Sequence, residues 1–318
     1  MSHINLITTC TNGKHGNGYN SLNLSEYSSG KTPSNVLIQS WCSATKEAIS
    51  KSAFIHVQDL YKGGHWATAK SICNQYPVDL WVLSAGLGLL HCKDKVVPYQ
   101  ATFSTGYQES IPLFSNDFHG KSFHRTWWKE ITERSVLKSE HPTSITGLMK
   151  EKPRDYFIIC GSPDYINAIE LDIINGLEYL SSPIKQVLII TSGKINIRLN
   201  EYLLKSDKKI ADFLSCNMLM LNISLAQYFI KLFLLKQLSD LSILSVKLTE
   251  HFISLPEREV SKGIRRSPDD VSKYILNLLQ QQPEISATKA LRAFRDSGNS
   301  FEEKRFRTLF KTLSARNA

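Results

Sequence analysis

Uninterrupted apolar runs alternate with segments of helical spacing over the first two-thirds of the chain. The apolar runs predict five strands, at residues 4–10, 53–57, 80–84, 156–160 and 186–191. The segments of helical spacing predict helices between these strands, at residues 34–51, 65–76, 121–138 and 163–180. Strands of continuous apolar character are typical of a sheet buried on both faces, and strands that alternate with helices are typical of parallel pairing. We therefore expect an α/β fold with a mostly parallel sheet flanked by helices.

The strand pattern disappears after about residue 210, where helical segments continue to residue 255 and form a helical C-terminal region. The segment 214–235 is strongly apolar, but Asn217, Asn222 and Lys231 interrupt it. Because a membrane-spanning helix needs about 20 predominantly apolar residues, we expect a buried amphipathic helix here and no membrane partner.

A segment that reads as a linker, 261–268, separates this region from three short predicted helices, at 269–281, 286–295 and 301–313. The expected organisation has three parts: an α/β catalytic or binding domain at 1–210, a helical extension at 211–260, and a basic three-helix module at 261–318.

Charge is concentrated at the C-terminal end of the chain. The 318 residues carry a formal net charge of +9, and residues 262–318 contain twelve lysines or arginines against six acidic residues. A localised basic excess favours a nucleic-acid partner, and three short helices resemble a helix-turn-helix in outline. The alternative is a solvated basic face on a packing or oligomerisation module. The candidate DNA-binding residues are Lys289, Arg292, Arg295, Lys304, Arg305, Arg307 and Lys311.

Six cysteines are spread along the chain without a Cys-x-x-Cys pair. This spacing argues against a zinc ribbon or a disulfide framework, so reduced thiols in a cytoplasmic protein are expected. The start of the chain lacks the charged and apolar regions of a signal peptide. The sequence requires no cofactor, and a metal ion stays possible.

The strand at 80–84 leads into a turn with two glycines, Gly86 and Gly88, and then into an extended segment that contains Pro98 and Tyr99. The carboxyl ends of strands are where open α/β sheets bind ligands. Ser84 and the glycine backbone are candidates to hold a base edge or a phosphate, and Tyr99 is a candidate to stack on a base. The alternative is a purely structural turn beside a half-buried tyrosine. A third glycine is missing, so this is not a dinucleotide fingerprint.

Cys10 follows the first predicted strand, with Lys14 and His15 close behind it. A cation beside a thiol favours the thiolate, which is the nucleophilic form. Cys10, Lys14 and His15 are therefore candidate catalytic residues, and the alternative is a buried cysteine followed by a solvated loop. We expect this segment and the turn before Leu89 to converge on one pocket large enough for a purine.

Two further segments carry candidate binding residues. Trp127 and Trp128 lie beside His124 and Arg125, a combination suited to stacking on an extruded base. Because adjacent residues on a helix point in different directions, we expect one tryptophan to be exposed; the alternative is core packing with one contact at the rim. Ser162 precedes the helix that begins at Pro163 and would serve as its cap, or the helix start would bind an anion.

The segment from residue 83 to residue 99 resembles a signature of YaaA-like proteins, a DNA-associated α/β family. The matched positions are Ser84, Gly88, Leu89, Leu90, Pro98 and Tyr99. Ala85 and Leu87 depart from the signature. A similar run occurs in archaeosine-synthase-like proteins, which act on 7-deazaguanine bases, and Asp59-Leu60-Tyr61 fits the wider group. The resemblance covers roughly residues 1–195.

The resemblance extends to the DpdC family, a component of systems that insert 7-deazaguanines into DNA. It implies hydration of a 7-cyano-7-deazaguanine nitrile to the amide, with DNA and other proteins of such a system as partners. Asp59 joins the candidate catalytic residues, and His15, His65 and Asp94 are the other candidates for the acid and the base. The alternatives are a non-catalytic YaaA-like DNA-binding stress protein and a nucleobase glycosidase or transglycosylase.

Overall fold

The computed structural model describes residues 2–15, 21–27, 31–51, 54–115, 120–135, 137, 139–256 and 263–317. The chain divides into two compact units, Met1–Pro256 and Glu257–Ala318. Each unit has a hydrophobic core of its own. The helical region after residue 210 belongs to the first unit, and the three C-terminal helices form the second.

A six-stranded sheet organises the first unit, in the order β10-β9-β8-β1-β4-β5. All neighbouring strands are parallel except β4 and β5, which form an antiparallel hairpin. The fold is therefore α/β with a mostly parallel sheet, as predicted. The strands are β1 (Ile4–Thr9), β4 (Val78–Ser84), β5 (Gly88–His91), β8 (Tyr156–Cys160), β9 (Val187–Thr191) and β10 (Leu203–Lys205).

Short strands outside the central sheet differ from the prediction. The strand expected at 53–57 is only the two-residue β3 (Ile55–His56), which pairs with β6 (Lys95–Val96). Tyr99 lies in β7 (Tyr99–Gln100), which pairs with β2 (Leu22–Asn23). The prediction of β3 as a sheet strand was wrong because its apolar run continues directly into a helical turn, α2 (Val57–Leu60).

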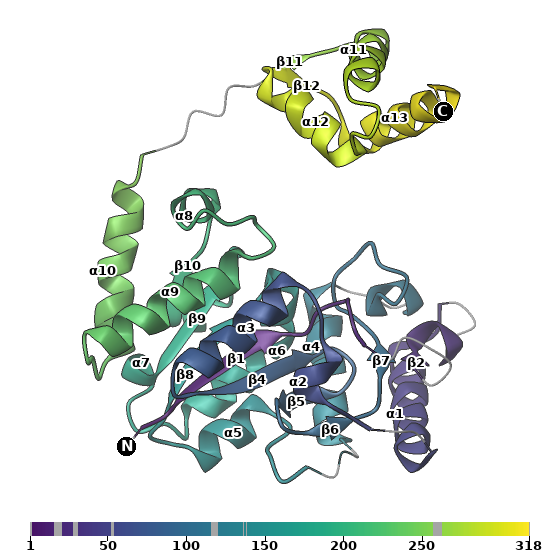
Figure 1. Ribbon diagram of the computed structural model, residues 1–318. Helices are drawn as coiled ribbons and strands as arrows, with labels where there is room; N and C mark the ends of the chain where they lie inside the picture. Colours follow the sequence, from purple (N-terminus) through teal and green to yellow (C-terminus); the bar gives the residue numbers. More distant parts are fainter. Residues whose placement is uncertain are drawn as a thin grey trace. The chain divides into compact units, whose positions relative to one another are not determined.

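Helices cover both faces of the sheet (Figure 1). On one face, α3 (Gly64–Gln75) packs against α9 (Leu221–Leu235) and both contact the strands. On the other, α6 (Pro163–Leu177) contacts α4 (Lys121–Glu133) and α5 (Ile145–Glu151). The remaining α-helices of this unit are α1 (Ser34–Lys51), α7 (Pro183–Gln186), α8 (Lys208–Phe213) and α10 (Leu241–Ser254).

The apolar segment around α9 is a core helix. Ile223, Phe229, Ile230 and Phe233 are buried where α9 packs over β8 and β9, which agrees with the predicted buried helix. Within the described part of the chain, no helix combines the length and apolar character needed to cross a membrane.

The second unit contains the three predicted helices, α11 (Pro268–Gln281), α12 (Ala287–Asp296) and α13 (Glu303–Asn317). Ile275, Phe294 and Phe306 form the centre of its small core. Two-residue strands β11 (Ile264–Arg265) and β12 (Asn299–Ser300) pair in parallel beside the helices.

Candidate functional site

The segment after β1 and the end of β4 lie side by side at the carboxyl edge of the sheet. Thr9 pairs with Leu83 at the end of the two parallel strands. The next amide, that of Cys10, donates a 3.1 Å hydrogen bond to the Leu83 carbonyl. Cys10 therefore lies beside Ser84, the last residue of β4. This is the edge at which open α/β sheets bind ligands.

A chain of buried hydroxyl groups begins at Ser84. Its Oγ donates to the Tyr99 hydroxyl at 2.6 Å, and the Tyr99 hydroxyl shares a 2.9 Å hydrogen bond with that of Tyr61. The same Ser84 Oγ accepts from the Leu87 amide at 2.9 Å. The turn thus fixes the serine, and the serine fixes two tyrosines, so Ser84 and Tyr99 form one hydrogen-bonded unit.

Lys14 lies against these two tyrosines and is only 2% exposed. Its Nζ is 4.8 Å from the centroid of the Tyr99 ring and 5.8 Å from that of Tyr61. Burial lowers the pKa of the Lys14 amine below its usual range, while the charge of a Cys10 thiolate acts in the opposite direction. Buried ionisable groups with a shifted pKa are concentrated at functional sites.

The thiol of Cys10 points to a third tyrosine. Cys10 Sγ lies 3.1 Å from the Tyr165 hydroxyl, which is also 3.4 Å from Thr102 Oγ1. Tyr165 belongs to the first turn of α6, directly after β8. Burial, together with the charge of Cys10, raises the pKa of Tyr165 well above its usual range, so its hydroxyl keeps its proton at neutral pH and can donate a hydrogen bond. We call Cys10, Lys14, Ser84, Tyr61, Tyr99 and Tyr165 the Cys10 centre.

Packed side chains fill most of the Cys10 centre. Cys10 is 8% exposed and Lys14 2%, and Ser84 and Tyr99 are completely buried. The two segments therefore meet as predicted, but the purine-sized opening expected between them is occupied by Lys14 and the tyrosine rings. A ligand reaches the thiol only if some of these side chains move.

A solvent-filled groove adjoins the centre on the far side of Tyr61. Its volume is about 480 Å³, and Tyr61 is one of its walls. It follows one side of α3 and receives His15, whose amide donates to the Leu60 carbonyl. His15 is exposed in this groove and is not part of the buried centre.

Two of the candidate acid and base residues lie away from the thiol. Asp59 is exposed on α2, outside the Cys10 centre, so the structure gives it no catalytic contact. His65 forms a 2.8 Å hydrogen bond with Thr8 Oγ1, and burial lowers its pKa to about 4. His65 is therefore neutral at physiological pH. It lies on α3, and its partner Thr8 lies on β1 two residues before Cys10, so this hydrogen bond is suited to support the strand.

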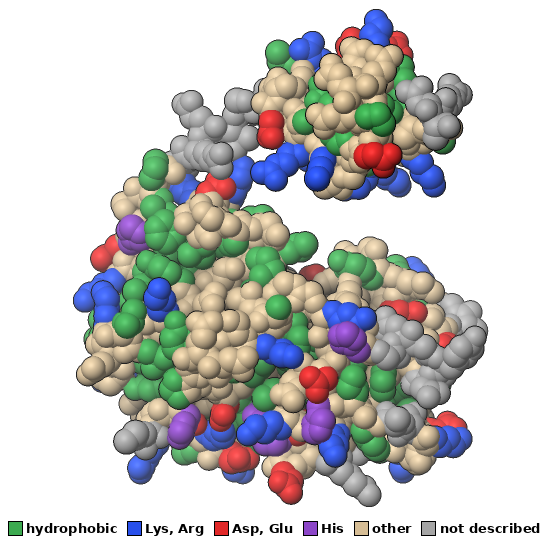
Figure 2. Space-filling view, in the orientation of Figure 1, with side chains coloured by type: hydrophobic (Ala, Val, Ile, Leu, Met, Phe, Trp, Pro, Cys, Tyr) green, Lys and Arg blue, Asp and Glu red, His purple; other side chains and the backbone are tan. Residues whose placement is uncertain are grey.

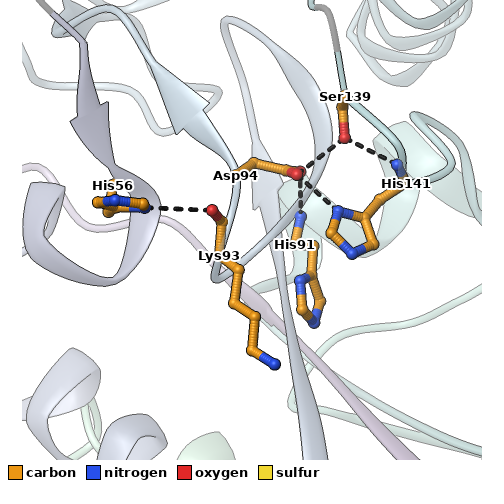
Figure 3. A network of polar contacts seen from close by, with 6 residues as sticks. All are labelled: His56, His91, Lys93, Asp94, Ser139 and His141. Carbon is orange, nitrogen blue, oxygen red and sulfur yellow. Dashed lines mark hydrogen bonds and ion pairs between the residues drawn. The ribbon is translucent and has the colours of Figure 1, made fainter.

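Asp94 belongs to a separate network of polar contacts (Figure 3). Its carboxylate pairs with His141 Nδ1 at 2.7 Å, and it accepts hydrogen bonds from Ser139 Oγ at 2.8 Å and from the His91 amide at 2.8 Å. His91 pairs with Trp81 at the far end of β5, three residues and roughly 10 Å along the strand from Gly88. Asp94 therefore orders a loop and does not reach Cys10.

The two glycines have structural roles in this conformation. A Cβ on Gly86 would lie 2.6 Å and 2.8 Å from two atoms of the Tyr99 ring, and the Gly86 carbonyl accepts from Trp41 Nε1. Gly88 has φ +83°, a left-handed conformation that favours glycine. Gly86 therefore allows Tyr99 to pack against the turn, and Gly88 allows the hairpin to form. A contact of either glycine with a base or phosphate stays a prediction.

Both tryptophans of α4 are buried, so the expectation that one is exposed was wrong. Trp127 is 0% exposed and Trp128 2%. Trp127 Nε1 donates to the Ala85 carbonyl, and Trp128 Nε1 donates to the Asp172 carboxylate. Helix α4 contacts α1, α6 and β5. Neither ring offers a free face for an extruded base.

Ser162 is the residue before α6, but its side chain accepts no hydrogen bond from the helix start. The prediction of a side-chain cap was wrong. Tyr165, three residues further on, is the residue of this junction that reaches Cys10, and the sequence pattern indicated the junction without giving that tyrosine a role. Tyr61 was visible only as part of the family resemblance.

The candidate DNA-binding residues lie on the surface of α12 and α13. Figure 2 shows lysine and arginine side chains along one edge of the second unit. Some are paired within the unit: Arg307 lies 2.9 Å from Glu303, and Arg305 lies over the Phe301 ring. All seven side chains are exposed: Lys289, Arg292, Arg295, Lys304, Arg305, Arg307 and Lys311.

In the described part of the chain, no three histidine, cysteine or acidic side chains are arranged to hold a metal ion together. A scan against protein-family models and a search of curated proteins give no match to this chain.

Proposed function

We propose that this protein is an enzyme that modifies a 7-deazaguanine base in DNA by converting its 7-cyano group to the amide. The observation that carries the proposal is the buried grouping of a thiol, an amine and a tyrosine hydroxyl at the ligand-binding edge of the sheet. Cys10 Sγ lies 3.1 Å from the Tyr165 hydroxyl, and Lys14 lies in the same centre. The identity of the base comes from the family resemblance.

Nitrile hydration can be written with the side chains of the Cys10 centre. The Cys10 thiolate adds to the nitrile carbon, so that a C–S bond forms and one C–N π bond breaks. The nitrogen takes a proton from the Lys14 ammonium, which gives a thioimidate. Water then adds to the same carbon, and one of its protons passes to the nitrogen. The C–S bond breaks as the carbonyl forms and the remaining hydroxyl proton returns to the group that protonated the nitrogen, which releases the amide and restores the thiolate. The net change is the addition of one water molecule.

The pKa shifts of Tyr165 and Lys14 suit these two residues to different roles in the reaction. Because burial raises the pKa of Tyr165, this residue keeps its proton and can hydrogen-bond to the nitrile nitrogen while a proton is delivered there. Because burial lowers the pKa of Lys14, its ammonium gives up a proton more readily than that of an exposed lysine. Ser84, Tyr99 and Tyr61 hold the surroundings of the amine through their hydrogen bonds.

One observation favours a second candidate, a non-catalytic DNA-binding protein. The low exposure of Cys10 and Lys14 leaves little room for a substrate in this conformation. A purely DNA-binding role requires only the exposed cations of the second unit.

Mass spectrometry of nucleosides separates the two candidates. DNA containing 7-cyano-7-deazaguanine is incubated with the purified protein, digested and analysed for a mass gain of one water. We expect Cys10→Ala to abolish the gain, and Tyr165→Phe to slow it by about 10²-fold or more, the usual cost of losing a hydrogen-bond donor to the reacting atoms. Cys216→Ala, remote in sequence and also a free cysteine, is the matched control. No mass gain with the wild-type protein would reject the enzyme and favour the DNA-binding candidate.

A further inference from the structure

The groove beside Tyr61 has the charge and position of a subsite for the backbone of a DNA strand. Among the described residues, none of those that line the groove is acidic, and they come from α3, from the segment just before it and from the turn after β1: His15, Tyr61, Lys62, Gly63, Trp66, Ala67, Lys70, Ser71 and Asn74. Lys62 lies just before α3 and Lys70 lies within it, and both line the groove. Two cations in one groove suit a ligand with repeated negative charges.

The aromatic residues of the groove are not available to stack on bases. Trp66 is 2% exposed and its Nε1 donates to the Gln58 carbonyl, and Tyr61 is 3% exposed. The accessible polar groups are therefore ammonium groups, an imidazole and the backbone at the start of α3. Gly63 precedes this helix with φ +95°, nothing lies within 4 Å of the space a Cβ would take, and no side chain caps the helix. Cationic and N–H donors without a stacking surface are typical of contacts to phosphate and sugar.

The groove is joined to the Cys10 centre by a short, rigid connection. Lys14 and Tyr61 form an antiparallel bridge, and the Lys62 amide donates to the Gly13 carbonyl at 2.8 Å. The side chain of Tyr61 therefore separates the groove from the buried amine. A nucleotide whose backbone lies in the groove would have its base next to Tyr61, on the side that leads to Cys10.

We propose that this groove binds the sugar–phosphate backbone beside the target nucleotide and directs its base toward the Cys10 centre. The inference rests on the proposed function for its ligand, DNA, but it assigns a binding role to Lys62 and Lys70 that the chemistry of the centre does not require. The proposal also provides a route past Tyr61 into the closed Cys10 centre.

Lysine acetylation of the full-length protein tests this proposal without relying on turnover. The acetylation rates of Lys62 and Lys70 are measured by mass spectrometry with and without a single-stranded oligonucleotide. Lys46 on α1 and Lys185 on α7, both exposed, serve as reference positions. We expect the oligonucleotide to slow acetylation of Lys62 and Lys70 several-fold and to leave the reference lysines unchanged. Equal rates at Lys62 and Lys70 with and without the oligonucleotide would overturn the proposal.

A second arm separates a DNA strand from a simple anion. Inorganic phosphate replaces the oligonucleotide at equal phosphate concentration. Protection by the oligonucleotide alone supports the strand subsite, whereas equal protection by inorganic phosphate indicates a small-anion site and overturns it. Protection without any nitrile hydration would leave the groove standing and reject the chemistry, so the two proposals fail separately.

The double variant Lys62→Ala, Lys70→Ala tests the same subsite by removing both of its lysine charges. For two phosphate contacts on a single strand, the slope of log affinity against log salt should become less steep by about 1.4. The control Lys46→Ala, Lys185→Ala removes the same charge elsewhere and should leave the slope unchanged. An equal change in both double variants would show only a net-charge effect and would contradict the subsite.

Discussion

Gly86→Ala tests whether the turn after β4 exists to pack Tyr99. The added Cβ would lie 2.6 Å and 2.8 Å from two ring atoms of Tyr99, and 3.0 Å from Trp41, where ordinary contact begins at 3.4 Å. Tyr99 and Trp41 are both completely buried, so a shift of either ring disturbs the side chains packed around it. Overpacking of this kind costs about 1–3 kcal/mol.

Displacement of the Tyr99 ring also strains two hydrogen bonds. Its hydroxyl is bound to Ser84 at 2.6 Å and to Tyr61 at 2.9 Å, and each such bond contributes about 0.5–1.5 kcal/mol. Together with the overpacking, we expect a loss of about 2–4 kcal/mol in the free energy of unfolding of the first unit. At about 2–4 °C per kcal/mol for a unit of this size, the melting temperature should fall by about 4–16 °C.

Differential scanning calorimetry of the full chain measures this shift. The matched control is Gly13→Ala, where the added Cβ would lie 3.5 Å from the Lys62 Cβ, an ordinary contact. We expect the control to stay within about 1 kcal/mol of the wild type. If Gly86→Ala melts at the same temperature as the control, Tyr99 is not tightly packed against the turn, and Gly86 would again be a candidate for a ligand contact.

Two further predictions concern charge. Because burial lowers the pKa of Lys14 in the folded state, the unfolded chain binds more protons between that lowered value and about 10.5, so this group makes stability rise with pH across that window. Urea unfolding of Lys14→Met from about pH 6 to pH 9.5 should show a stability gain over the wild type that shrinks as the pH rises; parallel curves would contradict a shifted Lys14. The double variant Arg305→Ala, Arg307→Ala should weaken DNA binding equally for all sequences and reduce the salt slope by about 1–2, measured by fluorescence anisotropy. An unchanged slope, with Lys46→Ala as the control, would remove α13 from the DNA contacts.

Much of the candidate site could be predicted from local sequence. The residues that could not be predicted reach the site through contacts between segments that are far apart in the chain. Cys10 and Ser84 were identifiable because each ends a strongly apolar strand, and strand ends of a parallel sheet meet at one edge. Tyr165 was not assigned because it is 155 residues from Cys10, and no local pattern distinguishes a tyrosine at a helix start from a surface residue. Asp59 was included on resemblance alone, and the short helix α2 leaves it exposed.

The amino-acid order by itself determined the α/β class, the position of most strands and helices, and the separate basic module. Periodicity is a property of neighbouring residues, so burial of apolar positions dictates the element that each segment forms. Only the tertiary structure decided that Lys14 is buried against two tyrosines and that both tryptophans of α4 are covered. Those outcomes depend on the strand order β8-β1-β4-β5 and on helices packed from both sides, which bring together side chains that are far apart along the chain.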